Sequence, residues 1–274
     1  MPEDIRTIII SPHLDDVALS LGGALLTEFF AKPILVINVF TESRHARFPS
    51  RPLDEPGITR MRSAEDDLFF SRLKVCKLDL GLPDAQLSLS RHQHTFPLIR
   101  LSSALGGHPF TAFRLPPQIE SKIPRTAKLP FLLKAARVDT DFSLLRGKLL
   151  SLIGRFPRTT LVSPLGLGIH PDHLVVAEVC RSLESNAART YYYEDLPYAA
   201  GYPLRRIAWH ARVFNARLEP VPVDIEGLLE RKIENLMIYR SQLRRRRMDQ
   251  VRAYAQRVSP GSACERLWRP RLRP

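Results

Sequence analysis

The chain has 274 residues, of which 44% are hydrophobic, and a formal net charge of +13 at pH 7. This length suits one large domain or two small ones, and the apolar share excludes a disordered chain. No apolar run is long enough to span a membrane, and a polar start leads directly into a strand-like stretch rather than a signal-peptide core. Three widely spaced cysteines without a Cys-x-x-Cys pair indicate reduced thiols. We therefore expect a soluble, cytoplasmic protein.

The first third of the chain alternates strand and helix signals. Apolar runs from Ile5 to Ile10 and from Ile34 to Phe40 are typical of strands buried on both faces, and Val75 to Leu80 is predicted as a third strand. Helices are predicted between them, from Val17 to Ala31 and from Arg60 to Leu73. This βαβαβ order predicts an α/β fold that is Rossmann-like and doubly wound, with a mainly parallel sheet and helices on both faces.

A regular pattern returns in the second half of the chain. Helices are predicted from Phe142 to Ile153 and from Leu174 to Leu183, and strands from Thr160 to Ser163 and from Thr190 to Tyr193. The stretch from Glu226 to Arg247 reads as one long terminal helix. These elements continue the same α/β alternation.

Residues 86–139 break the pattern, because they carry six prolines among scattered apolar residues. They predict an irregular insertion that covers a substrate site. We therefore predict a single α/β domain over residues 1–250, followed by a basic C-terminal tail over residues 251–274. Such a tail could hold a nucleic acid, but no aromatic or glycine pattern of a nucleic-acid module accompanies the charge. We favour a solvated helix face with a ragged terminus and expect no nucleic-acid partner.

The first motif with chemical potential is Pro12-His13-Leu14-Asp15-Asp16, which follows the first predicted strand. Open α/β sheets bind their ligands at the carboxyl ends of the strands. An imidazole and a carboxylate in one tight turn suit a divalent metal, and the neighbouring carboxylate is then free to transfer a proton. The alternative is that Asp15 or Asp16 only caps the following helix, because Asp is a favoured N-cap residue.

The second motif is His170-Pro171-Asp172-His173, which follows the predicted strand at Thr160. Pro171 suits the first position of a helix, and residues three apart share a helix face, so both histidines should face one cavity. Together the two motifs offer two histidines and one carboxylate, which leaves metal positions open for water and substrate. That arrangement is catalytic rather than structural, and it suits zinc or Fe(II).

At these residues the sequence resembles the PIG-L or LmbE-like family of zinc-dependent N-acetylglucosaminyl deacetylases. The resemblance runs from about residue 5 to residue 245 and is poor in the middle insertion. Its specific part is the combination of Pro12-His13-x-Asp15-Asp16, Gly22-Gly23 and His170-Pro171-Asp172-His173. Its weaker part is Arg62-x-x-Glu65, Leu82-Pro83-Asp84 and Tyr239-Arg240-Ser241-Gln242.

The resemblance implies a role for each residue of the two motifs. The implied metal ligands are His13, Asp16 and His173. Asp15 resembles the general base of the family. His170 is similar to the histidine that stabilises the oxyanion or protonates the leaving nitrogen, and Asp172 would orient one of the imidazoles.

The substrate-binding residues are expected around these motifs. Arg62 and Asp84 resemble family positions that contact the sugar or its substituents. Glu42 and Arg44 follow the second strand at the same sheet edge, so we expect them to line the pocket, although an ordinary loop is nearly as good an interpretation. Aromatic rings between Tyr192 and Tyr198 could stack on a sugar, and we slightly favour a core role for them.

The chain departs from the family pattern at two places. Leu14 replaces the usual Pro in the first motif, which should change the rigidity of the turn but not metal binding. Some members carry a mobile Tyr just before the second motif, where this chain has Gly168 and Ile169, so help from a Tyr at that place is not expected.

These observations predict a metal-dependent amidohydrolase that removes an N-acyl group, acetyl by resemblance, from an amino-sugar-containing small molecule or natural-product intermediate. A dinucleotide-binding protein is excluded, because the turn from Ser11 to Asp16 lacks G-x-G-x-x-G and its acidic side chains would repel a pyrophosphate. The alternative function is a basic nucleic-acid-binding α/β protein without catalysis.

Overall fold

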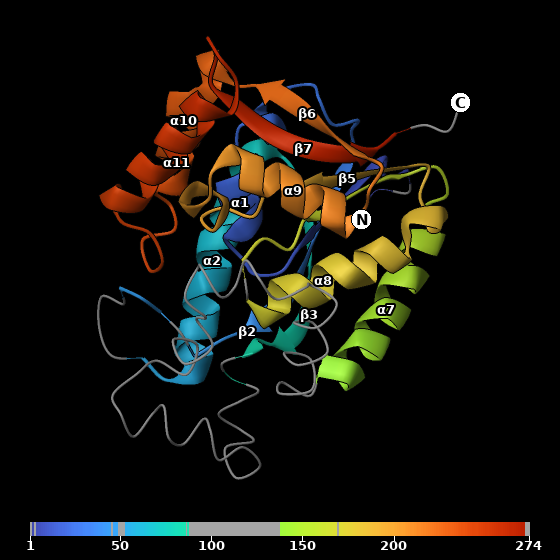
Figure 1. The fold of residues 1–274 in the computed structure, drawn as a ribbon. Helices are drawn as coiled ribbons and strands as arrows, with labels where there is room; N and C mark the ends of the chain where they lie inside the picture. The colour runs from blue at the N-terminus through green and yellow to red at the C-terminus, as the bar shows by residue number, and fades with distance from the viewer. Residues whose placement is uncertain are drawn as a thin grey trace, which may run out of the picture.

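A computed structural model describes residues 2, 4–44, 46–48, 53–85, 87, 138–168 and 170–271 of the chain (Figure 1). Its centre is one seven-stranded sheet with the order β3-β2-β1-β4-β5-β7-β6. The strands are β1 (Thr7–Ser11), β2 (Ile34–Glu42), β3 (Cys76–Pro83), β4 (Thr160–Pro164), β5 (Arg189–Tyr193), β6 (Leu218–Asp224) and β7 (Cys264–Pro270). The first five strands are parallel, and β7 runs antiparallel to both β5 and β6.

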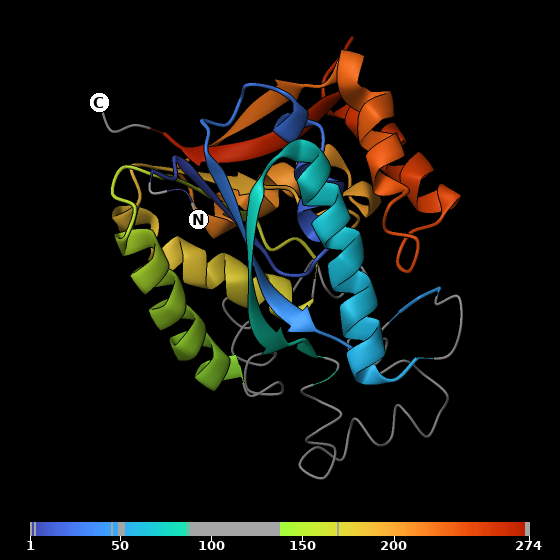
Figure 2. The same cartoon turned by 180° about the vertical axis from the view of Figure 1, so that it is seen from behind.

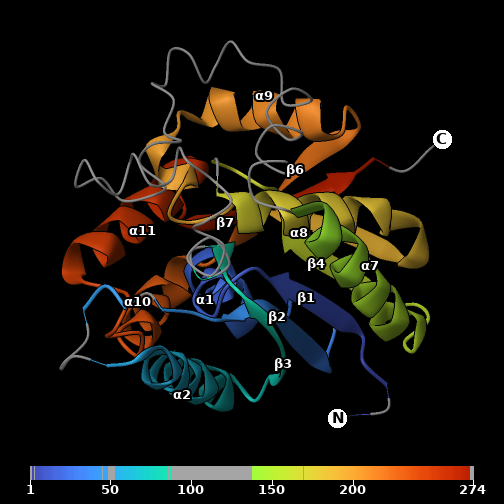
Figure 3. The same ribbon diagram turned by 90° about the horizontal axis from the view of Figure 1, so that it is seen from below.

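Helices cover both faces of this sheet (Figures 2 and 3). The helices are α1 (Asp16–Leu21), α2 (Glu55–Leu73), α7 (Val138–Gly154), α8 (Pro171–Ser182), α9 (Leu204–Phe214), α10 (Leu229–Leu236) and α11 (Arg245–Val258). Short 3₁₀ turns are η1 (Ala24–Leu26), η3 (Glu184–Asn186), η4 (Ala199–Gly201) and η5 (Glu226–Leu228). The helices α7 and α8 pack on one face, whereas α1, α2 and α10 pack on the other.

Strand β1 shows how the sequence builds the two-layer core. Ile8 and Ile10 point to the cluster under α7 and α8, whereas Ile9 between them points to the opposite cluster. Successive side chains of a strand face opposite sides, so an unbroken apolar run is what a strand buried on both faces requires. The predicted doubly wound, mainly parallel α/β fold is confirmed.

The order in which the chain adds strands to the sheet reverses at β1. Strands β2 and β3 lie on one side of β1, and β4 and β5 lie on the other. Ile9 lies opposite Val36 of β2 on one side and Val162 of β4 on the other. The connections from β1 and from β4 therefore leave the sheet in opposite directions, and open α/β sheets bind their ligands at such a switch point. The two predicted motifs follow these two strands.

The predicted helix from Val17 to Ala31 is too long. Helix α1 ends at Leu21, because Gly22 and Gly23 bring the chain against its neighbours. A Cβ atom on Gly22 would lie 2.4 Å from the carbonyl oxygen of Ala18, and one on Gly23 would lie 2.8 Å from the side chain of Ile225. Gly22 and Gly23 thus allow the chain to pack closely at this point.

The long terminal helix from Glu226 to Arg247 is also wrong. A 3₁₀ turn precedes α10, which ends at Leu236, and non-helical chain separates it from α11. Within that connection Tyr239 donates a hydrogen bond of 2.8 Å from its hydroxyl to Asp66 of α2. The connection is therefore held by tertiary contacts that helix periodicity does not reveal.

The predicted basic tail over residues 251–274 is wrong for its described part. Helix α11 continues to Val258, and β7 lies inside the sheet with Leu267 and Trp268 buried. Arg266 donates from Nε to Glu194 at 2.6 Å, and Arg252 donates from Nη2 to Glu230 at 2.6 Å. Arg252 and Arg266, two of the arginines that suggested a solvated tail, are thus paired with carboxylates of the domain.

The expected insertion over residues 86–139 lies mostly outside the described residues. Of this range the structure describes Leu87 and the first turn of α7, which begins at Val138. No helix among the described residues is long and apolar enough to cross a membrane.

Candidate active site

The first motif forms a tight turn between β1 and α1. Ser11 donates from its hydroxyl to the carbonyl oxygen of His13 at 2.6 Å, and the His13 amide donates to Asp16 Oδ2 at 2.9 Å. Asp15 occupies the N-cap position of α1, but its side chain makes no capping hydrogen bond. The carboxylate of Asp15 is therefore not used as a helix cap.

The second motif forms the start of α8, directly after β4. Pro171 is the first helical residue, as predicted, and His170 is the N-cap residue. Gly166 and Gly168 have φ angles of +69° and +84°, a conformation that glycine adopts without strain. This turn carries the chain from the end of β4 to α8, which begins beside the first motif.

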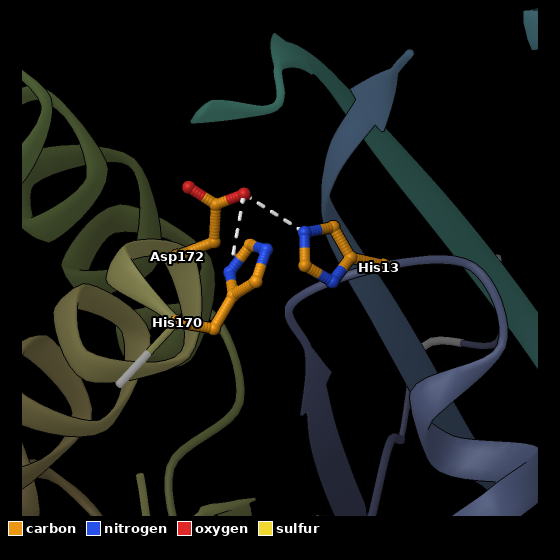
Figure 4. A group of neighbouring side chains, drawn as sticks. All are labelled: His13, His170 and Asp172. Atoms are coloured by element: carbon orange, nitrogen blue, oxygen red, sulfur yellow. Dashed lines mark hydrogen bonds and ion pairs between the residues drawn. The ribbon is translucent and has the colours of Figure 1, made fainter. Parts of the chain in front are cut away.

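The two motifs meet around the carboxylate of Asp172 (Figure 4). Nε2 of His13 lies 2.8 Å from Asp172 Oδ2, and Nδ1 of His170 lies 3.8 Å from the same oxygen. The backbone amide of Ala85, just beyond β3, also donates to it at 3.1 Å. Three separate strand ends of the sheet therefore converge on one buried carboxylate.

A second carboxylate, Asp16, lies between the remaining nitrogens of the two motifs. Asp16 Oδ2 is 3.1 Å from His13 Nδ1 and 3.3 Å from His173 Nε2. These three residues form one of two groups of possible ligand atoms that lie within 4.8 Å of one another; the other group is His13, His170 and Asp172.

Asp195 is a site residue that the sequence reasoning missed. Its Oδ1 lies 2.8 Å from His173 Nδ1, and its Oδ2 accepts a hydrogen bond of 2.9 Å from the Leu167 amide. Its position two residues beyond β5 was the available signal, because it places the carboxylate at the same sheet edge as both motifs.

The first group fits a divalent cation better than the second. When Asp172 accepts the proton on His13 Nε2, the lone pair of His13 lies on Nδ1 and points toward Asp16. When Asp195 accepts the proton on His173 Nδ1, the lone pair lies on Nε2 and also points toward Asp16. Ligating histidines almost always have such a hydrogen-bonded partner on the other ring nitrogen.

The carboxylates of the site favour the binding of a cation. Burial opposes a charge on His13, but its bonds to Asp16 and Asp172 outweigh that effect and raise its pKa to about 10. Burial also opposes ionisation of Asp16, yet the His173 charge and the His13 bonds lower its pKa to about 2. These carboxylates therefore hold positive charge in place, and a metal ion would compete with protons for the same nitrogens.

The remaining catalytic candidates lie beside this centre. Arg62 of α2 reaches Asp15, with 3.4 Å between Nη2 and Oδ1. The ring of His170 is 5.0 Å from that of His13 and edge-on to it. Burial lowers the pKa of His170 to about 3, so its imidazole is neutral near pH 7.

The predicted substrate-binding residues differ in burial and in their position along the sheet edge. Asp84 is buried and accepts a hydrogen bond of 2.8 Å from the Leu87 amide, and its own amide donates to the Glu42 carbonyl. Glu42 is the last residue of β2, on the edge that carries the site. Arg44 is exposed two residues later.

Two of the weaker sequence motifs bind each other. Glu65 of α2 accepts bonds from the amide of Ser241 at 2.8 Å and from its hydroxyl at 2.6 Å. The neighbouring Asp66 accepts from Tyr239. Both motifs thus attach the α10–α11 connection to α2, the helix that presents Arg62.

The chain is similar in sequence and in fold to known deacetylases. No family model matches the chain. It is 26% identical over 258 residues to the 2'-N-acetylparomamine deacetylase of Streptomyces fradiae, covering 93% of this chain and 80% of that protein. A deacetylase from the teicoplanin biosynthesis pathway has a similar structure, with a TM-score of 0.64, 21% identity, and coverage of 96% of this chain and 97% of that one. The zinc inhibited form of teicoplanin deacetylase matches with a TM-score of 0.61 and 19% identity, over 96% and 97% of the two chains. The chain therefore shares sequence with one deacetylase and its fold with others, which confirms the resemblance to the PIG-L and LmbE-like deacetylases.

Proposed function

We propose that this chain is a metal-dependent deacetylase that hydrolyses the N-acetyl group of an amino sugar within a small molecule or natural-product intermediate. The sequence relative acts on an acetylated amino-sugar compound, as its name states, and matches over nearly the whole chain. The observation that carries the proposal is the convergence of His13 Nδ1 and His173 Nε2 on Asp16, with Asp15 beside them. The nucleic-acid-binding alternative finds no support in the relatives.

The donor set supports a role for His13, Asp16 and His173 as metal ligands. Two neutral imidazoles and one carboxylate suit zinc and also Fe(II). Such an ion, when bound, lowers the pKa of a water from 15.7 to about 7 and polarises the acyl oxygen. A similar structure describes zinc as inhibiting its protein, so Fe(II) and one equivalent of zinc both belong in any test.

Asp15 is placed to act as the general base. Its carboxylate is partly exposed, lies next to the proposed ligand Asp16 in the chain, and is not spent on a helix cap. It would take a proton from the attacking water, while the guanidinium of Arg62 orients it. Asp15 would then return this proton to the leaving nitrogen.

His170 and Asp172 complete the proposed chemistry from the start of α8. Asp172 accepts from His13 and so fixes which nitrogen of that ring carries the proton. His170 stands beside both imidazoles and is neutral, so its N–H would stabilise the acyl oxygen as that oxygen gains negative charge. Protonation of the leaving amine by His170 remains the alternative to Asp15.

Substrate selection is proposed to involve residues at the same edge of the sheet. Arg62, Glu42 and Asp84 are candidates on the described elements, and Arg44 on the adjoining surface. The cover formed by the segment 86–139 stays a prediction, since most of it lies outside the described residues. Exchange of this segment should change which acyl sugar is accepted without changing the metal content.

The proposal is tested by incubating metal-reconstituted protein with 2'-N-acetylparomamine, N-acetylglucosamine and an N-acetylglucosaminyl glycopeptide. We expect free amine and acetate to appear in equal amounts from at least one of them. Removal of the metal by dipicolinate should stop the reaction, and either Zn(II) or Fe(II) should restore it. If protein loaded with each ion in turn released no amine from any of these N-acyl sugars, the proposed function would be contradicted.

A further inference from the structure

The ring of Tyr198 lies against His173, one of the proposed metal ligands, although it belongs to neither motif. Tyr198 follows β5 by five residues, and its ring meets the ring of His173 edge-on, with 5.2 Å between centroids. The ring of His170 is 6.4 Å away. A Cβ atom on Gly168 would lie 3.2 Å from the Tyr198 ring, so the missing side chain at residue 168 makes room for it.

The backbone around Tyr198 is held by several hydrogen bonds. The Ala199 amide donates to the carbonyl oxygen of Asp195 at 2.9 Å, which joins this turn to the residue that orients His173. Arg257 of α11 donates from Nη2 to three carbonyl oxygens of the same turn, at Ala199, Ala200 and Tyr202, at distances from 2.8 to 3.1 Å. The ring position is therefore set before a substrate binds.

The hydroxyl of Tyr198 is a neutral hydrogen-bond donor near pH 7, because an ordinary phenol has a pKa of about 10. The base of the ring rests on Gly168, on the α8 side of the site. Burial raises the pKa of Tyr198 above its ordinary value, and the negative charges of Asp16 and Asp15 are the next causes. A neutral hydroxyl at this place can donate a hydrogen bond.

We propose that Tyr198 is a catalytic residue that donates a hydrogen bond from its hydroxyl to the acyl oxygen of the substrate. This inference rests on the proposed deacetylase function. The hydroxyl forms no covalent bond and keeps its proton throughout. Its bond to the acyl oxygen strengthens as that oxygen gains negative charge in the tetrahedral state, and weakens again when the amine leaves. Fixed donors of this kind typically contribute ~100- to 1,000-fold to turnover.

The decisive variant is Tyr198→Phe, which keeps the ring against His173 and removes only the hydroxyl. We expect kcat to fall ~100-fold or more, with KM changed little and the metal content unchanged. Binding of a methylphosphonamidate of glucosamine, which imitates the tetrahedral state, should weaken by a similar factor in calorimetry. Binding of the product glucosamine should not change, because it has no acyl oxygen.

The matched control is Tyr191→Phe. Tyr191 lies on β5 and packs against Phe29, with 5.5 Å between ring centroids, away from the two motifs. It should keep wild-type kcat and wild-type affinity for the phosphonamidate. Tyr198→Leu provides a further comparison, because it removes the ring as well as the hydroxyl.

The outcomes separate this inference from the proposed function. If the wild-type protein deacetylates and Tyr198→Phe keeps its kcat and its affinity for the phosphonamidate, Tyr198 is not a hydrogen-bond donor. If only Tyr198→Leu is impaired, chiefly in KM, the ring stacks on the sugar and the inference is overturned. If the wild-type protein deacetylates none of the sugars, the proposed function itself has failed.

Discussion

His173 Nδ1 lies 2.8 Å from Asp195 Oδ1, and this pair fixes which face of the imidazole is available at the centre of the site. The other oxygen of Asp195 accepts the Leu167 amide, so the carboxylate cannot rotate away. Both residues are fully buried. The His13–Asp172 pair repeats the arrangement from the other side of the site.

We expect Asp195→Asn to weaken metal binding ~10- to 100-fold. The Leu167 amide must be met by the amide oxygen of the new side chain, which turns its NH₂ group toward His173 Nδ1. That nitrogen then has to accept, so the ring proton moves to Nε2, the atom that faces Asp16. Competition with a chelator of known affinity measures the loss. Asp224→Asn, an exposed carboxylate at the end of β6, should bind metal like the wild type; equal affinity in both variants would count against the pairing.

The two possible ligand groups make opposite predictions for the histidines of α8. We expect His173→Ala to lose the metal, whereas His170→Ala should retain it and lose turnover. The reason is that both nitrogens of His173 are engaged by Asp16 and Asp195, the arrangement of a ligating imidazole. Elemental analysis after dialysis decides the matter. Metal loss in His170→Ala, with full content in His173→Ala, would assign the ion to the other group.

The two tryptophans of the chain should differ sharply in their effect on stability. Trp268 of β7 is buried and donates from Nε1 to Glu194 at 2.8 Å, whereas Trp209 of α9 is 53% exposed. We expect Trp268→Ala to lower the free energy of unfolding by ~3–5 kcal/mol and Trp209→Ala to change it by less than about 0.5 kcal/mol. Urea denaturation measures both. If Trp268→Ala left the free energy of unfolding unchanged, the C-terminal segment would be a loose tail, as the sequence predicted.

Asp66 should make the protein less stable as the pH rises through mildly acidic values. Burial raises its pKa to about 7 in the folded chain, despite the Lys77 charge and its hydrogen bonds, against 3.8 for an ordinary Asp. Between about pH 4 and pH 7 the folded state therefore holds a proton that the unfolded state releases, so stability is present below this window and is lost as the pH rises. The loss is on the order of a few kcal/mol at most.

The control for this prediction is a neighbour that contacts the same lysine. Lys77 Nζ lies 3.2 Å from Asp66 and 2.9 Å from Asp67, whose side chain is 62% exposed. We expect Asp66→Asn to flatten the dependence of the unfolding free energy on pH over this window, and Asp67→Asn to leave it as in the wild type. Parallel profiles for Asp66→Asn and the wild type would show that Asp66 is not the source.

The first half of the fold could be predicted because its first two strands are rich in apolar residues. Such runs as Ile34 to Phe40 have no competing interpretation once a helix pattern follows them. The C-terminal part could not, because β7 mixes charged with apolar residues without a strand period, and its arginines resemble a solvated tail until their partners are known. Glu194, which accepts from Arg266 and Trp268, lies 72 and 74 residues away from them in the chain.

The same distinction applies to the candidate site. His13, Asp16, His170, Asp172 and His173 were predicted because each motif gathers its polar residues within a few positions at a strand end. Asp195 and Tyr198 come from a segment that also holds the buried core rings Tyr192 and Tyr193. The role of a single carboxylate or ring can be assigned only from the residues that it contacts. Those contacts depend on the packing of β5 beside β4.

The assignment of Asp15 as base and Asp16 as ligand is tested most directly by measuring metal content and turnover together in Asp15→Asn and Asp16→Ala. The substrate should be the N-acetyl sugar that the wild-type protein hydrolyses best. We expect Asp15→Asn to keep the ion and lose ~100- to 10,000-fold in turnover, because only proton transfer is removed. Asp16→Ala should lose the ion and the activity together. Loss of the ion in Asp15→Asn with retention in Asp16→Ala would reverse the two roles, and full activity in both would contradict the whole account.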